Sequence, residues 1–143
     1  MSEENSASGD DPADPTPRWS ELPNAPEPGT ALCPLAELRD GEARMHSVFA
    51  AADVQLQHPF RILLLRSGDQ VQAYVNRCAH FGVPLAQRQE QLLYTPHTSV
   101  LCNVHYARYR WHDGVCDRGD CQGASLPPIP LLQDSAGMLR IAP

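Results

Sequence analysis

An all-β fold is predicted by three features of this 143-residue sequence. Segments rich in aliphatic and aromatic side chains are short, turn-forming residues separate them at close intervals, and no stretch shows a convincing helical repeat. Short strands with frequent turns are typical of a small antiparallel β-sandwich. The length suits one domain with a real core and is too short for an added catalytic domain of ordinary size. We therefore expect a single all-β domain.

The chain is expected to begin with a disordered tail over residues 1–28, followed by the domain over 29–143. The tail contains six Pro, many Ser, Asp and Glu, and almost no aliphatic side chains. Such a composition cannot offset the entropy of ordering by burying apolar surface. Trp19 and Leu22 are its sizeable apolar groups, and we expect them to lie against the domain surface.

The N-terminal half of the domain reads as two strand pairs. The second pair is the clearest hairpin in the sequence, because apolar residues fill both arms and a Ser-Gly-Asp turn joins them. The expected strands are 32–38 and 43–49 around a turn at 39–42, then 60–66 and 71–75 around a turn at 67–69.

The C-terminal half reads as short strands interrupted by loops. The region 77–90 lacks periodicity and carries Gly82 and Pro84, so it is expected to be a loop. Further strands are expected at 91–94, 99–101, 108–111, 129–132 and 138–141, with a loop at 117–128.

Four residues in these loops have the types and spacing of metal ligands. Cys78 and His80 form a C-x-H pair, and Cys102 and His105 form a C-x-x-H pair. Two thiolates and two imidazoles can hold a tetrahedral zinc ion. They can equally hold a [2Fe–2S] cluster in which two His replace two Cys on one iron.

The sequence around these four residues resembles the Rieske family. The first segment reads Cys-Ala-His-Phe-Gly-Val-Pro-Leu over 78–85, the second reads Cys-Asn-Val-His-Tyr-Ala-Arg-Tyr over 102–109, and a Gly- and Cys-containing segment follows over 119–126. The resemblance covers roughly 31–143. It implies a Rieske-like antiparallel β-sandwich with a loop-rich cluster-binding subdomain at about 77–128.

The resemblance also implies the cofactor and its ligands. One Rieske-type [2Fe–2S] cluster per chain is expected, with Cys78 and Cys102 on one iron and His80 and His105 on the other. Imidazole ligands lower the negative charge at their iron and raise its potential, so the electron is expected to reside there.

Neighbouring side chains are expected to surround the cluster. Phe81 and Tyr106 would contribute to an apolar collar, and the hydroxyl of Tyr109 would either donate to a ligand sulfur or turn to solvent. Tyr106 stands where the family usually has Gly, which makes the local backbone a question, since Gly is favoured where φ is positive.

Other positions indicate the subtype. Val83 and Val104 occupy the places where respiratory members carry a pair of bridged Cys, and Ala107 replaces a Ser that hydrogen-bonds the cluster. A low-potential, ferredoxin-like protein is therefore expected. We do not expect a disulfide between Cys116 and Cys121, because five Cys in an intracellular-looking chain point to metal chemistry.

Charge and hydropathy restrict the partners and the location. The formal net charge of −6 resides in the first 30 residues, where seven acidic residues face Arg18 alone, while the rest of the chain is balanced. This gives no support to nucleic-acid binding. No signal peptide or apolar run of about 18 residues is visible, so a cytoplasmic, monomeric protein without a membrane anchor is expected.

The leading functional hypothesis is an electron-transfer component rather than a stand-alone enzyme. Such a ferredoxin would take one electron from a flavin-dependent reductase and pass it to a terminal oxygenase or similar enzyme. Only 38 residues follow His105, which leaves no room on this chain for an oxygenase domain with its own iron site. The alternatives are an accessory subunit similar to the small subunit of nitrite reductases and a zinc-binding interaction domain.

Overall fold

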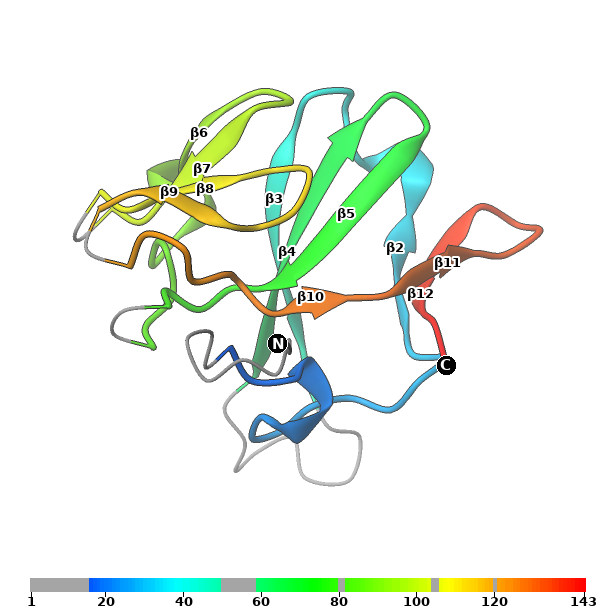
Figure 1. Ribbon diagram of the computed structural model, residues 1–143. Coiled ribbons are helices and arrows are strands. Elements are labelled where there is room, and N and C mark those ends of the chain that lie inside the picture. Colours follow the sequence, from blue (N-terminus) through cyan, green and yellow to red (C-terminus); the bar gives the residue numbers. More distant parts are fainter. Residues whose placement is uncertain (1–15, 50–58, 80–81, 104–105, 120) are drawn as a thin grey trace, which may run out of the picture.

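The residues that the structure describes form three antiparallel β-sheets (Figure 1), and the predicted all-β fold is confirmed. The computed structural model describes residues 16–49, 59–79, 82–103, 106–119 and 121–143. The central sheet has the order β10-β5-β4-β3, a second has β11-β12-β2, and a third has β6-β7-β8-β9. Their bounds are β2 Ala31–Pro34, β3 Ala43–Val48, β4 Phe60–Ser67, β5 Gln70–Val75, β6 Leu93–Thr95, β7 Ser99–Leu101, β8 Arg108–Arg110, β9 Cys116–Arg118, β10 Pro128–Ile129, β11 Leu131–Gln133 and β12 Met138–Ile141.

The structure has two hydrophobic cores, and the hairpin of β4 and β5 contributes side chains to both. Successive side chains of a strand point to opposite faces of the sheet. Ile62 and Leu64 accordingly join one core cluster, whereas Leu63 and Leu65 join the other. All four are essentially inaccessible to solvent. This two-sided burial explains why the apolar run in β4 is continuous rather than alternating.

One core lies between the central sheet and the sheet β11-β12-β2, which together form the sandwich. It gathers apolar side chains of β2, β4, β5, β10 and β12. Trp19 and Leu22 pack against it while partly buried, and Trp19–Glu21 forms a 3₁₀ turn, η1. Residues 1–15 lie outside the described residues, so the boundary between tail and domain stays a prediction.

The other core joins the central sheet to the sheet β6-β7-β8-β9, which lies at the left of Figure 1. Tyr74 of β5 donates its hydroxyl to the carbonyl of Trp111 at 2.7 Å, and the Trp111 indole donates to the carbonyl of Ser99 at 2.9 Å. Gly114 has φ +73°, and a Cβ there would lie 2.5 Å from the Tyr74 ring. The third sheet is thus held firmly against the sandwich, and it carries the segments on either side of Cys102.

Three expected elements differ from the structure. The strand expected over 32–38 ends at Pro34, where the 3₁₀ turn η2 (Leu35–Glu37) begins. The strand expected over 129–132 is split at Pro130 into β10 and β11, which belong to different sheets. The loop expected over 117–128 contains most of β9, which pairs with β8. In the first two cases a Pro, which lacks an N–H, interrupts the ladder.

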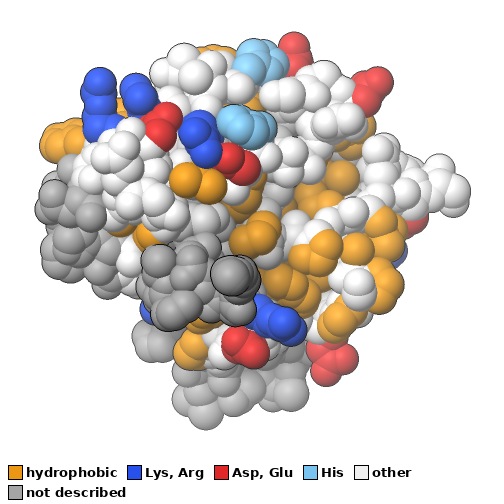
Figure 2. Space-filling view, viewed as in Figure 1, with side chains coloured by type: hydrophobic (Ala, Val, Ile, Leu, Met, Phe, Trp, Pro, Cys, Tyr) orange, Lys and Arg blue, Asp and Glu red, His pale blue; other side chains and the backbone are white. Residues whose placement is uncertain are grey.

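Apolar side chains gather on one face of the molecule over the region of β10 and β11, with charged groups scattered elsewhere (Figure 2). In the described part of the chain, no helix has the length and apolar character that crossing a membrane requires.

Candidate metal centre

Cys78 and Cys102 begin two loops with the same backbone hydrogen bonds. In the first loop, which runs from Cys78 to Val83, the Cys78 N–H donates to the carbonyl of Val83 at 2.6 Å and the Gly82 N–H donates back to the carbonyl of Cys78 at 2.7 Å. The second loop runs from Cys102 to Ala107. There the Cys102 N–H donates to the carbonyl of Ala107 at 2.9 Å and the Tyr106 N–H donates to the carbonyl of Cys102 at 2.7 Å. Each loop therefore turns back on its own cysteine.

Both loops use a left-handed residue four positions after the cysteine. Gly82 has φ +71° and Tyr106 has φ +59°. Glycine adopts this conformation at little cost, whereas a residue with a Cβ is strained there. The side chain of Tyr106 is 61% exposed, so burial of the ring does not compensate for the strain. The question that the sequence raised at Tyr106 is thus answered: the backbone keeps the glycine-like conformation.

The two cysteines are the buried anchors of these loops. Both are 0% exposed and belong to the core cluster beneath the third sheet. A backbone bond joins the loop regions, since the Asn103 N–H donates to the carbonyl of Leu85 at 2.8 Å. The Leu85 N–H in turn donates to Oδ1 of Asn76 at 2.8 Å. The chain just after the first loop is therefore tied both to the second loop and to the end of β5.

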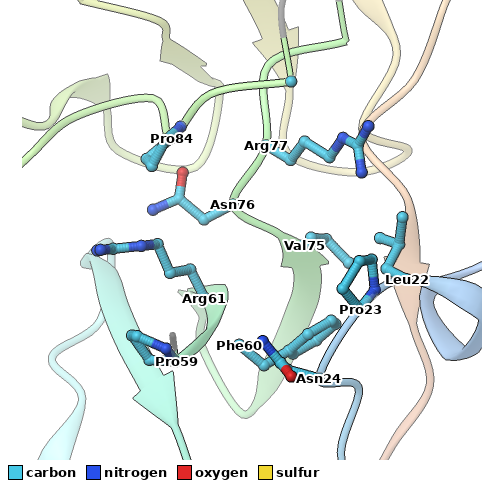
Figure 3. Close-up of a pocket in the computed structure, with 11 residues that line it drawn as sticks. Leu22, Pro23, Asn24, Pro59, Phe60, Arg61, Val75, Asn76, Arg77 and Pro84 are labelled. Carbon is cyan, nitrogen blue, oxygen red and sulfur yellow. The ribbon is translucent and has the colours of Figure 1, made fainter. Parts of the chain in front are cut away.

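Asn76 also lines a surface pocket of about 300 Å³ beside the first loop (Figure 3). The bond from Leu85 fixes Oδ1 as the acceptor, which leaves Nδ2 as a buried donor without a hydrogen-bond partner in the described part of the chain. Arg61, Arg77 and Pro84 line the same pocket. Neither Cys78 nor Cys102, the two predicted ligands within the described residues, is among its lining residues.

The hydroxyl of Tyr109 lies among three groups under the first loop. Tyr109 is fully buried, and its Oη lies 3.4 Å from Cys78 Sγ and 3.3 Å from Cys121 Sγ. The Ala79 N–H donates to the same oxygen at 2.9 Å. Burial, together with the bonds to the two thiols, raises the pKa of Tyr109 far above its ordinary value. The phenol therefore keeps its proton and can donate it to a sulfur.

A third segment packs against Ala107, the last residue of the second loop. Gly119 has φ +112°, and a Cβ there would lie 3.1 Å from Cα of Ala107. Cys116 and Cys121 flank this glycine, and Cys121 Sγ lies 3.0 Å from Cys116 Sγ without a disulfide. Burial, and secondarily the bond from Cys121, raises the pKa of the Cys116 thiol to about 12.

The described residues contain the cysteine half of the predicted ligand set. His80, His105 and Phe81 lie outside them. Consistent with that, no three His, Cys, Asp or Glu side chains gather as a metal site within the described ranges. What the structure does show fits a cluster: two buried sulfurs at the starts of matching loops, with a phenol proton beside one of them.

Sequence reasoning missed two contributors. The hydrogen bond from the Leu85 N–H to Asn76 depends on where the chain returns after the first loop, and no local sequence pattern signals this. From the sequence, Cys121 was considered as a partner of Cys116 in a disulfide that was not expected, and no contact with Tyr109 was assigned to it. Its contact with Tyr109 depends on the pairing of β8 with β9.

The comparisons with known proteins agree with this geometry. The family model described as the Rieske [2Fe-2S] domain matches residues 30–133. No curated protein sequence matches the chain. Among solved structures, the ferredoxin of carbazole 1,9a-dioxygenase from Nocardioides aromaticivorans IC177 is similar with a TM-score of 0.60 and 17% identity, over 82% of this chain and 99% of that one.

A second similar structure is the terminal oxygenase of carbazole 1,9a-dioxygenase from Novosphingobium sp. KA1. It has a TM-score of 0.61 and 19% identity, over 79% of this chain and 29% of that one. At these identities the likeness concerns the fold. The match thus covers almost all of that ferredoxin and only part of the longer oxygenase chain.

Proposed function

The chain belongs to the Rieske [2Fe-2S] domain family, and from this premise we propose that it is a one-electron carrier, a ferredoxin that receives an electron from a flavin-dependent reductase and delivers it to a terminal oxygenase or similar enzyme. The family's cofactor is a [2Fe–2S] cluster. When bound, such a cluster accepts and releases one electron at a time. The protein's part is to hold, shield and tune it.

The proposed ligands are Cys78, His80, Cys102 and His105. The observation that carries this assignment is the matched pair of loops, each of which begins at a buried cysteine and closes on itself through two backbone bonds. A pair of loops that present one thiolate each is suited to the two sulfur ligands of one iron. The two imidazoles follow at positions 80 and 105 of the same loops.

The surrounding residues have two further roles in this proposal. Leu126 and Ala107 are buried in the core cluster that also contains the two cysteines, so they exclude water from the sulfurs. The hydroxyl of Tyr109 is placed to donate to Cys78 Sγ. A hydrogen bond to sulfur stabilises the more negative, reduced state and so raises the potential.

The proposed partners follow from the architecture. The chain matches a ferredoxin over almost its whole length, and another similar structure is named as the complex of reduced oxygenase and oxidized ferredoxin in carbazole 1,9a-dioxygenase. We therefore include a terminal oxygenase among the partners and place the carrier, as a monomer, in the cytoplasm. The unbridged Cys33, Cys116 and Cys121 are compatible with a reducing compartment.

The test is electron transfer between purified components. Anaerobically purified protein is mixed with an NAD(P)H-dependent flavoprotein reductase and NAD(P)H, and its visible absorption is followed. We expect bleaching by one electron per chain, followed by recovery when an oxidised Rieske oxygenase is added. Protein that contains zinc and no sulfide, or that is not reduced even by dithionite, would contradict the proposal.

A further inference from the structure

Cys116 and Cys121 form a buried thiol pair that the one-electron function leaves unused. Their sulfurs lie 3.0 Å apart, and a disulfide bond measures about 2.0 Å. The two sulfurs therefore need to approach by only about 1 Å to become bonded.

The backbone holds this pair together. The Cys116 N–H donates to the carbonyl of Ala124 at 2.8 Å, and the Gly123 N–H donates to the carbonyl of Cys116 at 2.9 Å. The Ala124 N–H closes a turn on the carbonyl of Cys121 at 2.9 Å. Cys121 thus lies in a tight turn whose end is paired with Cys116, and this arrangement presents one sulfur to the other.

Hydrogen bonds connect the pair to the candidate metal centre. The Cys116 thiol donates to the carbonyl of Arg118 at 3.2 Å, and the Cys121 thiol donates to Cys116 Sγ. Cys121 Sγ also lies 3.3 Å from the hydroxyl of Tyr109, which lies 3.4 Å from Cys78 Sγ. Since the Ala79 N–H already donates to that hydroxyl oxygen, Tyr109 has one proton to share between two sulfurs.

We propose that Cys116 and Cys121 are a redox-active dithiol, which a low-molecular-weight disulfide converts to an intramolecular disulfide, and that Tyr109 transmits this change to the ligand sulfur of Cys78. The first half of the proposal is independent of the carrier function, and the second half rests on it.

The reaction is a thiol–disulfide exchange in two steps. Cys121 is 9% exposed and Cys116 is 1% exposed, so the Cys121 thiolate attacks the disulfide R–S–S–R and releases one R–S⁻, which takes up a proton as R–SH. Cys116 Sγ then attacks Cys121 Sγ while its thiol proton passes to the departing sulfur, which leaves as the second R–SH. The pair loses two electrons and two protons, and the two R–SH molecules carry them away.

The effect on the centre has a predicted sign. In the dithiol, Cys121 donates onward to Cys116, which makes its sulfur a better acceptor, and it competes with Cys78 for the proton of Tyr109. In the disulfide, Cys121 no longer donates a hydrogen bond to Cys116, so its sulfur becomes a weaker acceptor for the Tyr109 proton. Tyr109 then donates more fully to Cys78, the reduced state is favoured, and the midpoint potential shifts in the positive direction.

Trypsin gives a direct test of the disulfide, because each of the five Cys falls in its own tryptic peptide. Cleavage after Arg110 and Arg118 places Cys116 in the peptide 111–118 and Cys121 in a peptide that begins at Gly119. Anaerobically purified holoprotein is treated with oxidised glutathione, alkylated, digested and analysed by mass spectrometry. We expect these two peptides to be linked, the link to disappear on treatment with dithiothreitol, and iron to be retained.

Two variants serve as controls. Cys33→Ser should still form the link, whereas Cys116→Ser should trap glutathione on Cys121 as a mixed disulfide. Absence of the linked peptides, or persistence of the mixed disulfide in the unaltered protein, would overturn the dithiol. This readout needs no cluster, so it is separate from a failure of the proposed function.

The second half is tested by the midpoint potentials of the dithiol and disulfide forms. We expect a positive shift on disulfide formation in the unaltered protein and no shift in Tyr109→Phe. A linked protein whose potential is unchanged or lower, or a shift that survives in Tyr109→Phe, would overturn the transmission through Tyr109.

Discussion

The loops that begin at Cys78 and Cys102 share a hydrogen-bond pattern and differ in the residue that occupies its left-handed position. In both, the cysteine N–H reaches the carbonyl five residues on, and the N–H four residues on returns to the cysteine carbonyl. The left-handed position is Gly82 in one loop and Tyr106 in the other. Tyr does not by itself favour a left-handed backbone conformation. The conformation at Tyr106 is therefore imposed by the burial of Cys78 and Cys102 and by the surrounding hydrogen bonds.

The loops also differ in their support. The first is tied through Leu85 to Asn76, and its sulfur lies beside Tyr109. At the end of the second, the backbone of Gly119 lies against Ala107. A hydroxyl donor therefore serves the Cys78 side, and close backbone packing serves the Cys102 side.

The largest expected effect concerns what the loops have in common. Cys78→Ala and Cys102→Ala should each reduce the iron and sulfide content of purified protein to background, because each removes a proposed sulfur ligand that the other loop cannot replace. Cys33→Ala, at a buried cysteine of the other core, should keep full iron content. A loss of cluster in only one of the two ligand variants would break the equivalence of the loops.

The next effect concerns the tie at Asn76. Asn76→Ala leaves the buried Leu85 N–H without its acceptor, which should lower the free energy of unfolding by about 1–3 kcal/mol. Denaturant titration measures this loss. Asn103→Ala is the matched control, because Asn103 contributes a backbone N–H to Leu85 that the substitution preserves. Equal losses of unfolding free energy in both variants would show that the side chain of Asn76 stabilises the fold no more than that of Asn103.

A smaller effect should distinguish the two left-handed positions. Gly82→Ala adds a Cβ whose nearest atoms in the described residues belong to the flexible Arg77 guanidinium, at 3.4 Å, so its expected cost of about 1–2 kcal/mol is that of the backbone conformation. Tyr106→Gly relieves the same strain and should leave stability unchanged or raise it by up to about 1 kcal/mol. Thermal and denaturant unfolding check both. If Tyr106→Gly were as costly as Gly82→Ala, the exposed ring would be what holds the loop.

The smallest effect concerns the hydroxyl beside Cys78. Tyr109→Phe should keep the cluster and lower its midpoint potential by roughly 40 mV, which corresponds to a hydrogen bond of about 1 kcal/mol in a one-electron couple. Tyr74→Phe is the control, since that hydroxyl donates to Trp111, and it should leave the potential unchanged. Redox titration followed by EPR gives both values.

The parts of the fold that follow local rules were predictable. The hairpin expected at 60–66 and 71–75 is β4 and β5 almost residue for residue, because its apolar arms and Gly-containing turn are strong local signals. The split at Pro130 was not predicted, since the sequence on both sides is apolar and only the tertiary arrangement assigns β10 and β11 to different sheets.

The candidate site shows the same division. Cys78 and Cys102 were predicted as ligands from residue type and spacing together with the resemblance to the Rieske family, and the structure adds that both are buried at the starts of matching loops. The identical bonding of their loops, the tie at Asn76 and the contact of Tyr109 with Cys121 join residues whose approach depends on the packing of the third sheet against the central one. No pattern within a single segment encodes those contacts. His80 and His105 lie outside the described residues, and their role stays a prediction.

The central claim is that two cysteines and two histidines of the matched loops hold the cluster. The most direct test asks whether His80 and His105 bind it. Protein labelled with ¹⁵N-histidine is purified anaerobically, reduced with dithionite and examined by pulsed EPR. The account predicts a rhombic signal with average g below the free-electron value and coupling to two histidine nitrogens, lost in both His80→Ala and His105→Ala. A reduced cluster without histidine coupling, or protein that holds zinc and no sulfide, would contradict it.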